Sequence, residues 1–225
     1  MSLRKTNLVQ NEFYHIYNRG NGKSQIFLDD EDYERFTKLL YIANSELKFN
    51  FRNSIVRNNI DSFDFERGET LVNVLAWVLM PNHFHIILIS PRSDLGEKFN
   101  PITEFIRKVS TSYSMYFNKK YGRTGSLFEG KFKSNHVGEE NYFNYLFSYV
   151  HLNPVKLIQK DWKINGINDK NKTIDYLKKY KYSSFFDYFV DSRKYSKIID
   201  RQILPDHIRV NHTRELFDFF ENYSI

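Results

Sequence analysis

The chain contains no cysteine and no long apolar run, and each absence excludes a class of protein. Without cysteine there is no disulfide scaffold and no thiolate metal site. A membrane-spanning helix needs about 18 or more consecutive apolar residues, and the sequence has no such stretch. We therefore expect a cytoplasmic protein with no membrane partner.

Aromatic and basic residues, by contrast, are abundant. Of the 225 residues, 41% are hydrophobic and 17% aromatic, which is too much apolar material for a disordered chain and enough for a real core. Lys and Arg number 33 against 27 Asp and Glu, which gives a net charge of +6. A moderate basic excess of this kind is compatible with nucleic-acid binding and equally with ordinary solubility.

The hydrophobic pattern predicts helices that alternate with a few antiparallel strands, which is typical of an α+β fold. Residues 50–69 are mixed and polar and are expected to form a loop or an irregular hairpin. The predicted strands cover 13–18, 72–80 and 83–89. One predicted helix begins at 29–32. The others cover 100–122, 139–151, 183–189 and 213–222.

The clearest helix runs from Asn100 to Gly122. Asn100 is a natural N-cap, Pro101 suits the first helical position, and Gly122 suits the C-terminal stop. Apolar residues at three- and four-residue spacing form one stripe, with Tyr113 near its centre. We expect this stripe to pack on the sheet, where a tyrosine serves either as core or as a reactive group.

Two histidines bracket one apolar residue at the start of the strand 83–89. Because side chains alternate along a strand, His83 and His85 share one face and Phe84 takes the other. At about 3.3 Å per residue the two imidazoles lie roughly 7 Å apart along the strand, close enough to lean onto one divalent ion. If the helix 100–122 covers this face, Tyr113 is the partner that meets them.

Basic and aromatic residues are interleaved around residues 119–133. Lys and Arg contact phosphates, while aromatic rings offer faces for unpaired bases. The alternative is a basic hairpin whose aromatic side chains belong to the core. Five basic side chains of this segment and Arg19, at the end of the first strand, are the candidates for nucleic-acid contacts. The five are Lys119, Lys120, Arg123, Lys131 and Lys133.

The segment Met80-Pro81-Asn82-His83-Phe84-His85 resembles the His-hydrophobic-His signature of the single-tyrosine HUH transposases. Other segments resemble the same family, in the same order, over roughly residues 10–190. The branch most similar to the chain is that of the REP-associated tyrosine transposases. The matching segments are 14–20, 112–118, 122–134, 149–156 and 182–185.

This resemblance implies a ferredoxin-like α+β core, an antiparallel sheet flanked by helices, with a helical C-terminal extension. We expect a catalytic domain over residues 1–160 and the extension over 161–225, packed on it. A monomer is the expected state, with a homodimer as the alternative.

The resemblance also implies a DNA transposase, an endonuclease and strand transferase acting on single-stranded or hairpin DNA. His83 and His85 would hold Mg²⁺ or Mn²⁺, and Tyr113 would attack the scissile phosphorus to form a 5′-phosphotyrosine link, with Tyr116 as the alternative nucleophile. Shorter relatives keep a polar metal ligand one helical turn after the tyrosine. Phe117 occupies that position here, so Asn118, Glu129 or water is expected to complete the site.

Two other functions remain open at this stage. One is a domesticated, non-catalytic protein that binds DNA or RNA hairpins on the same scaffold. The other is a metal-independent nuclease that uses histidine and tyrosine as acid and base, and whose activity would survive EDTA.

Overall fold

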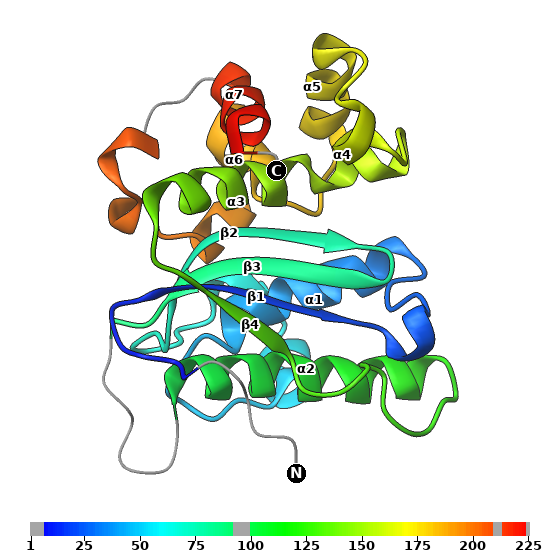
Figure 1. Ribbon diagram of the computed structural model, residues 1–225. Helices are drawn as coiled ribbons and strands as arrows, with labels where there is room; N and C mark the ends of the chain where they lie inside the picture. Colours follow the sequence, from blue (N-terminus) through cyan, green and yellow to red (C-terminus); the bar gives the residue numbers. More distant parts are fainter. Residues whose placement is uncertain (1–6, 92–99, 209–212, 224–225) are drawn as a thin grey trace.

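A four-stranded antiparallel sheet forms the centre of the molecule, in the order β2-β3-β1-β4 (Figure 1). The computed structural model describes residues 7–91, 100–208 and 213–223. The strands are β1 (Phe13–Arg19), β2 (Asn73–Met80), β3 (His83–Ile89) and β4 (Lys133–Val137). α1 (Asp30–Ile42) links β1 to β2, and α2 (Pro101–Lys120) links β3 to β4. This β-α-β-β-α-β order confirms the predicted ferredoxin-like core.

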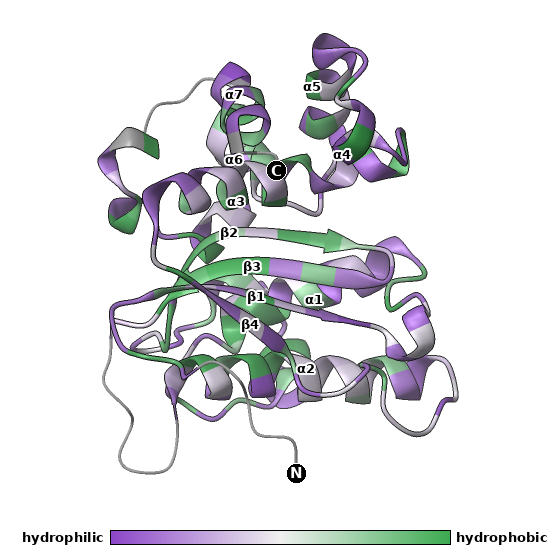
Figure 2. Ribbon diagram, in the orientation of Figure 1, coloured by the Kyte–Doolittle hydropathy of each residue, from purple (hydrophilic) through white to green (hydrophobic). Residues whose placement is uncertain are grey.

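α1 and α2 cover one face of the sheet (Figure 1). The strand residues on this face are apolar because side chains alternate, and they include Ile16, Trp77 and Phe84, all fully buried. Figure 2 shows β2 and β3 hydrophobic along most of their length, with hydrophilic colour at the end of β3 next to the β2–β3 turn. That hydrophilic end is the histidine pair.

α3 (Glu140–Leu152) lies across the opposite face, where it buries Val78, Met80 and Ile87. The helices of the C-terminal region surround α3 on the side away from the sheet (Figure 1). They are α4 (Trp162–Asn165), α5 (Lys170–Lys179), α6 (Phe185–Phe189) and α7 (Thr213–Tyr223).

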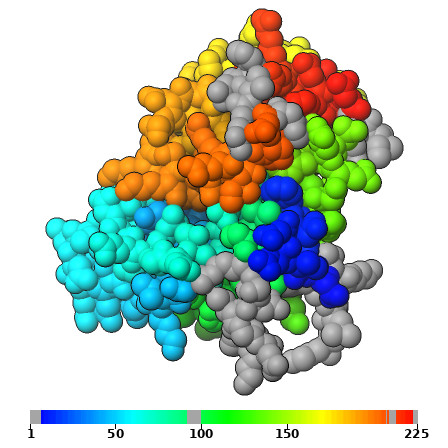
Figure 3. Space-filling model, turned by 90° about the vertical axis from the view of Figure 1, so that its left-hand side faces the viewer, coloured from blue at the N-terminus to red at the C-terminus, as the bar shows by residue number. Residues whose placement is uncertain are grey.

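The C-terminal region is joined to the sheet edge as well as to α3. The backbone N–H of Ser184 donates to Trp77 O at 2.9 Å, and that of Asp200 donates to Val74 O at 2.8 Å. Figure 3 shows this region, in orange, lying directly against the cyan segment that leads into β2. The helical extension is therefore confirmed, while the boundary at residue 160 stays a prediction.

Most of the helices and strands lie where the sequence patterns predict them. The Asn100 side chain accepts a hydrogen bond from Thr103 N at 3.2 Å, and Gly122 takes φ +60° directly after α2, as expected of a C-terminal stop. β4, α4 and α5 were not predicted, and 50–69 contains a π-helical turn over Arg52–Val56. Within the described residues, no helix is both long enough and apolar enough to span a bilayer.

Candidate active site

The two histidines of β3 share one face, as predicted, and that face is the one covered by α3. Their ring centroids are 5.0 Å apart. His85 is 7% exposed, and His83, next to the β2–β3 turn, is half-buried. Burial lowers the pKa of His83 to about 4 and the pKa of His85 well below its ordinary value, so both rings are neutral. Neutral imidazoles keep the lone pair that a metal ligand needs.

Tyr113 does not meet these histidines, and the prediction that it does is wrong. Its fully buried ring lies on the other side of the sheet, against Phe27 and Phe36, and its hydroxyl donates to Ile26 O. The reason is that the apolar stripe of α2 packs on the apolar face of β3, which carries Phe84. The same alternation that groups the histidines points them away from α2.

The other candidates on α2 also lie away from the histidines. Tyr116 donates a hydrogen bond to Asp32 at 3.0 Å, and burial raises its pKa. Asn118 donates to Gly125 O at 2.9 Å, within the loop that follows α2. The structure therefore supports neither Tyr116 as nucleophile nor Asn118 as metal ligand.

α3 brings a different tyrosine to the histidines. The ring centroid of Tyr149 is 5.4 Å from that of His85, and the ring is partly exposed. The Asn153 side chain, one helical turn later, lies close enough to influence the pKa of both Tyr149 and His83. Burial raises the pKa of Tyr149, while Asn153 and the charge of Lys156 act in the opposite direction.

A third histidine lies behind the pair, on β1. His15 Nε2 is 2.8 Å from His85 Nδ1, and the two rings stack with centroids 5.0 Å apart. Burial lowers the pKa of His15 to about 3, so this contact joins two neutral imidazoles, of which one donates and the other accepts. Tyr17 stacks on the outer side of His15 with a centroid distance of 4.9 Å.

The donor set at this point fits a divalent metal. His85 Nε2 is buried and has no hydrogen-bond partner among the described residues, whereas its Nδ1 is engaged by His15. His83 Nδ1 is 2.6 Å from Asn82 Oδ1, which leaves Nε2 as its metal-binding atom. No group of three or more His, Asp, Glu or Cys in the described part of the chain is placed to hold a metal. The two imidazoles and the nearby Asn153 amide are groups that could contact a metal here, and water would supply other ligands.

A cleft of about 460 Å³ opens in front of the histidines and Tyr149. Glu129 is the one carboxylate among its lining residues, and it is bonded to Arg19, with Nη2 2.9 Å from Oε1. The other charged residues that line the cleft are cations, and this concentration of positive charge suits the binding of a phosphate backbone. The cations that line the cleft are Arg19, Lys23, Lys131, Lys133 and Lys156.

Three of the six predicted DNA contacts thus reach the cleft, and the other three do not line it. Lys120 at the end of α2 is held by three carboxylates, those of Asp29, Glu31 and Asp32, at 2.8 to 3.0 Å. Arg123 lies over the Phe117 ring, 5.5 Å from its centroid, and Lys119 is exposed on α2.

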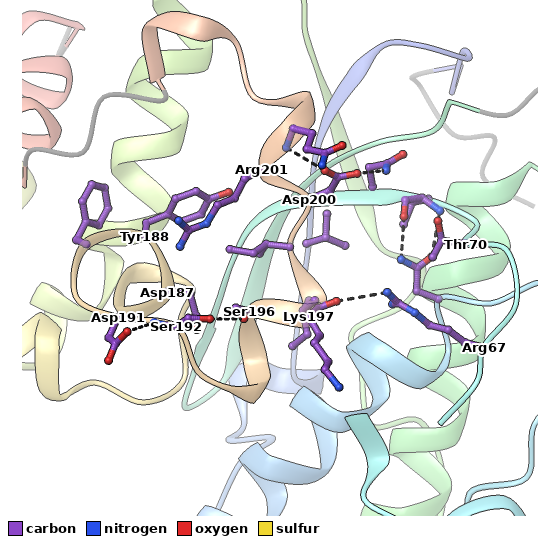
Figure 4. Close-up of a pocket in the computed structure, with 18 of the residues that line it drawn as sticks. Arg67, Thr70, Asp187, Tyr188, Asp191, Ser192, Ser196, Lys197, Asp200 and Arg201 are labelled. Atoms are coloured by element: carbon purple, nitrogen blue, oxygen red, sulfur yellow. Dashed lines mark hydrogen bonds between the residues drawn. The ribbon is translucent and has the colours of Figure 1, made fainter. Parts of the chain in front are cut away.

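A larger hollow of about 800 Å³ lies at the other end of the β2–β3 hairpin and has a different character (Figure 4). Several of its charged side chains have partners within the protein. Asp187 pairs with Arg193 at 3.0 Å, the Arg67 guanidinium donates to Lys197 O at 3.4 Å, and Asp200 accepts from Asn73 at 2.6 Å. This network ties the C-terminal region to the sheet edge and leaves the histidine cleft as the candidate site.

Sequence reasoning missed Tyr149, Asn153 and His15, although two signals were present. Tyr149 and Asn153 have the spacing of a tyrosine followed by a polar residue one turn later, the arrangement that the helix 100–122 lacks. His15 and Tyr17 alternate onto one face of the first strand. What the sequence could not show is the register that places Tyr17 opposite His85.

Comparison with known proteins supports the fold. No protein-family model and no curated protein matches the sequence. Among solved structures, a REP-associated tyrosine transposase bound to a REP hairpin superposes with a TM-score of 0.51 at 15% identity, over 84% of this chain and 85% of that one. A candidate transposase from Deinococcus radiodurans R1 has a TM-score of 0.34 at 13% identity, over 71% of this chain and 97% of that one. The first match shows that the chain has the fold expected from the sequence resemblance.

Proposed function

We propose that this protein is a transposase-type strand transferase that cuts and rejoins single-stranded DNA through a tyrosine, with a divalent metal held by histidines. The observation that carries the proposal is the convergence of His83, His85 and Tyr149 in one cationic cleft, with the buried Asn153 one helical turn after Tyr149. The nucleophile in this proposal is Tyr149, in place of Tyr113.

His83 and His85 would hold Mg²⁺ or Mn²⁺, and Asn153 would complete the protein ligands in place of Asn118. When bound, the metal polarises the scissile phosphate, which makes phosphorus open to a weak nucleophile. Glu129 stays a further candidate because it lines the same cleft, although its carboxylate is bonded to Arg19.

His15 would act as the positioning residue for His85. If His85 Nδ1–H donates to His15 Nε2, the lone pair of His85 Nε2 is left free for the metal. Metal-binding histidines usually donate their second N–H in this way, and the partner fixes both the tautomer and the ring orientation. The 2.8 Å contact between the two buried rings has the length that this role requires.

Tyr149 would attack the phosphorus. Its oxygen forms the bond to phosphorus, the bond from phosphorus to O3′ breaks, and the phenolic proton ends on the departing O3′. The product is a 5′-phosphotyrosine link and a free 3′-hydroxyl, so the reverse reaction rejoins strands without another energy source. The nearby Asn153 side chain and the charge of Lys156 favour the phenolate, since both act to lower the pKa of Tyr149.

The substrate class follows from the walls of the cleft. Cations on both β1 and the segment that leads into β4 can follow a sugar-phosphate backbone, and the half-buried Tyr149 requires that the phosphate be exposed. The structurally similar REP-associated transposase is bound to a DNA hairpin, which supports a hairpin with single-stranded arms as the substrate here.

Denaturing electrophoresis tests the proposal. The protein is incubated with Mn²⁺ and labelled single-stranded and hairpin oligonucleotides from the DNA that flanks its gene. A covalent adduct that forms with Mn²⁺, and fails to form with EDTA, is the expected result. Tyr149→Phe should form no adduct. Tyr17→Phe is its matched control, because Tyr17 lines the same cleft on β1 and the loss of its hydroxyl should leave the adduct intact.

The rival functions give different results in the same assay. Salt-sensitive binding to every hairpin without any adduct would show a non-catalytic binding protein. Cleavage that persists in EDTA and leaves no adduct would show a metal-independent nuclease. Either result contradicts the proposal, provided that a related active transposase forms its adduct under the same conditions.

A further inference from the structure

A second cavity of about 460 Å³ lies beside the histidine cleft, on the α2 side of the sheet. Its volume is in the range of pockets that hold small organic groups. One wall is a single stripe of α2, with residues three and four apart: Thr103, Ile106, Arg107, Ser110 and Thr111. The other wall is formed by Phe128, Gly130, Lys131 and Phe132, with Asn18 of β1 between the walls.

A bulge at the sheet edge opens this cavity. Lys133 pairs with Tyr17, and Glu129 N donates to Arg19 O at 3.0 Å, so residues 130–132 stand opposite Asn18 alone. The extra residues loop out from the edge, and Gly130 takes φ +139°, which other residues rarely adopt. The Asn18 side chain donates to Gly130 O at 3.0 Å and holds the bulge in place.

The bulge joins the two cavities. Asn18 and Lys131 line both of them, and Lys131 is exposed. A DNA strand with one phosphate in front of Tyr149 can therefore cross the sheet edge at Lys131. The ammonium group is suited to the next phosphate, and the base attached there can turn toward α2.

The chemistry of the walls suits a nucleobase. Ile106 is 1% exposed and Phe128 5%, while Phe132 is partly exposed, so the cavity offers apolar surface and aromatic faces. Ser110 Oγ is buried and has no hydrogen-bond partner in the described part of the chain. A hydroxyl both donates and accepts, so it can bond to the edge of an inserted base.

We propose that this cavity takes one unpaired nucleobase of the DNA strand whose phosphate is cleaved in the histidine cleft. The inference rests on the function proposed above and adds a base-binding site to it. Because a paired and stacked base cannot enter, the site favours single-stranded arms over duplex, and it contributes affinity that phosphate contacts cannot provide.

A pair of DNA probes isolates that contribution. One is a hairpin with six thymidines at each end, and the other is the same hairpin with abasic residues in place of those thymidines, so that the phosphates are identical. Fluorescence anisotropy on the full-length protein gives Kd for both. Base stacking on an aromatic side chain is worth about five- to 150-fold in affinity, so the wild type should prefer the thymidine probe by at least about fivefold.

Phe132→Leu keeps apolar bulk but removes the aromatic face, and it should remove most of this preference while leaving Kd for the abasic probe unchanged. Ser110→Ala is the second variant and should reduce the preference by a smaller factor. Phe186→Leu is the matched control on α6, away from both cavities, and should change neither Kd.

The proposal is overturned if the wild type shows no preference, or if Phe132→Leu and Ser110→Ala both keep the full preference. If the variants lose the same amount of affinity for both probes, the preference is unchanged, and this result also overturns the proposal. If the adduct forms in Mn²⁺ and the preference is absent, only the base site fails. If neither probe binds and no adduct forms, the proposed function fails with it.

Discussion

Tyr113 and Tyr149 lie on helices that cover opposite faces of the sheet, and the surroundings of the two side chains differ. On the α2 face, Tyr113 is fully buried among aromatic rings and its hydroxyl is bonded to a backbone carbonyl. On the α3 face, Tyr149 is partly exposed beside His85 and opens into a cleft lined by lysines. A tyrosine at the centre of an apolar stripe is thus part of the core, whereas a reactive tyrosine needs polar neighbours and access to substrate.

The largest expected effect separates these two residues directly. Tyr149→Phe should abolish the covalent adduct, because it removes the hydroxyl next to His85 that is proposed to attack the phosphate. Tyr113→Phe should leave the adduct in place. Denaturing electrophoresis in Mn²⁺ measures both, and an adduct retained by Tyr149→Phe but lost in Tyr113→Phe would reverse the assignment of the two faces.

Removal of a metal ligand on the α3 face should come next in size. His85→Ala, like EDTA, should slow adduct formation on the order of 10³-fold, since metal polarisation of the phosphate contributes several kcal/mol. Single-turnover kinetics with and without Mn²⁺ give the rate. A variant that reacts as fast as wild type would show that the histidines hold no catalytic metal.

His15→Ala should weaken Mn²⁺ binding by about 10- to 100-fold, because the partner that orients His85 is lost. Electron paramagnetic resonance of free Mn²⁺ follows binding without any DNA. The ¹⁵N shifts of the His85 ring provide a second readout: a ring protonated at Nδ1 in the wild type should become a mixture of tautomers in the variant. An unchanged tautomer and affinity would leave His15 as packing only.

Tyr113→Phe should destabilise the protein by about 1–2 kcal/mol, because Ile26 O loses its buried donor. Urea denaturation measures the change in the free energy of unfolding. A variant as stable as the wild type would show that the Tyr113 hydroxyl is not part of the core that holds α2 on the sheet.

The smallest expected effect concerns charge. Lys156→Ala should weaken binding to single-stranded DNA and lower the slope of log Kd against log salt by about 0.7, the value for one phosphate contact. Lys119→Ala, on the α2 face, should leave the slope unchanged. Equal slopes for the two variants would mean that the DNA does not follow the cleft.

Much of the fold could be predicted from the sequence because the capping residues and the hydrophobic patterns agreed with one another. Asn100 and Pro101 marked the start of α2, and alternation correctly placed His83 and His85 on one face of β3. β4 was missed because its residues, Lys133–Val137, lack an apolar alternation: they lie on the sheet edge and are largely exposed.

Only part of the candidate site could be predicted from the sequence, and the reason is geometric. Periodicity shows which side chains share a face, but not which helix covers that face. Both α2 and α3 have apolar stripes, and the choice between them depends on the matching apolar surfaces of β3, with Phe84 on one side and Ile87 on the other. His15 needed the strand register, which no local pattern reveals.

The most direct test of this account is to identify the residue that carries the DNA. The adduct formed in Mn²⁺ is digested with a protease and a nuclease, and the modified peptide is sequenced by mass spectrometry. We predict a nucleotide on the Tyr149 side chain, in the peptide that also contains Asn153. A nucleotide on Tyr113 or Tyr116 would contradict the account, because it would require the α2 face of the sheet to open during the reaction.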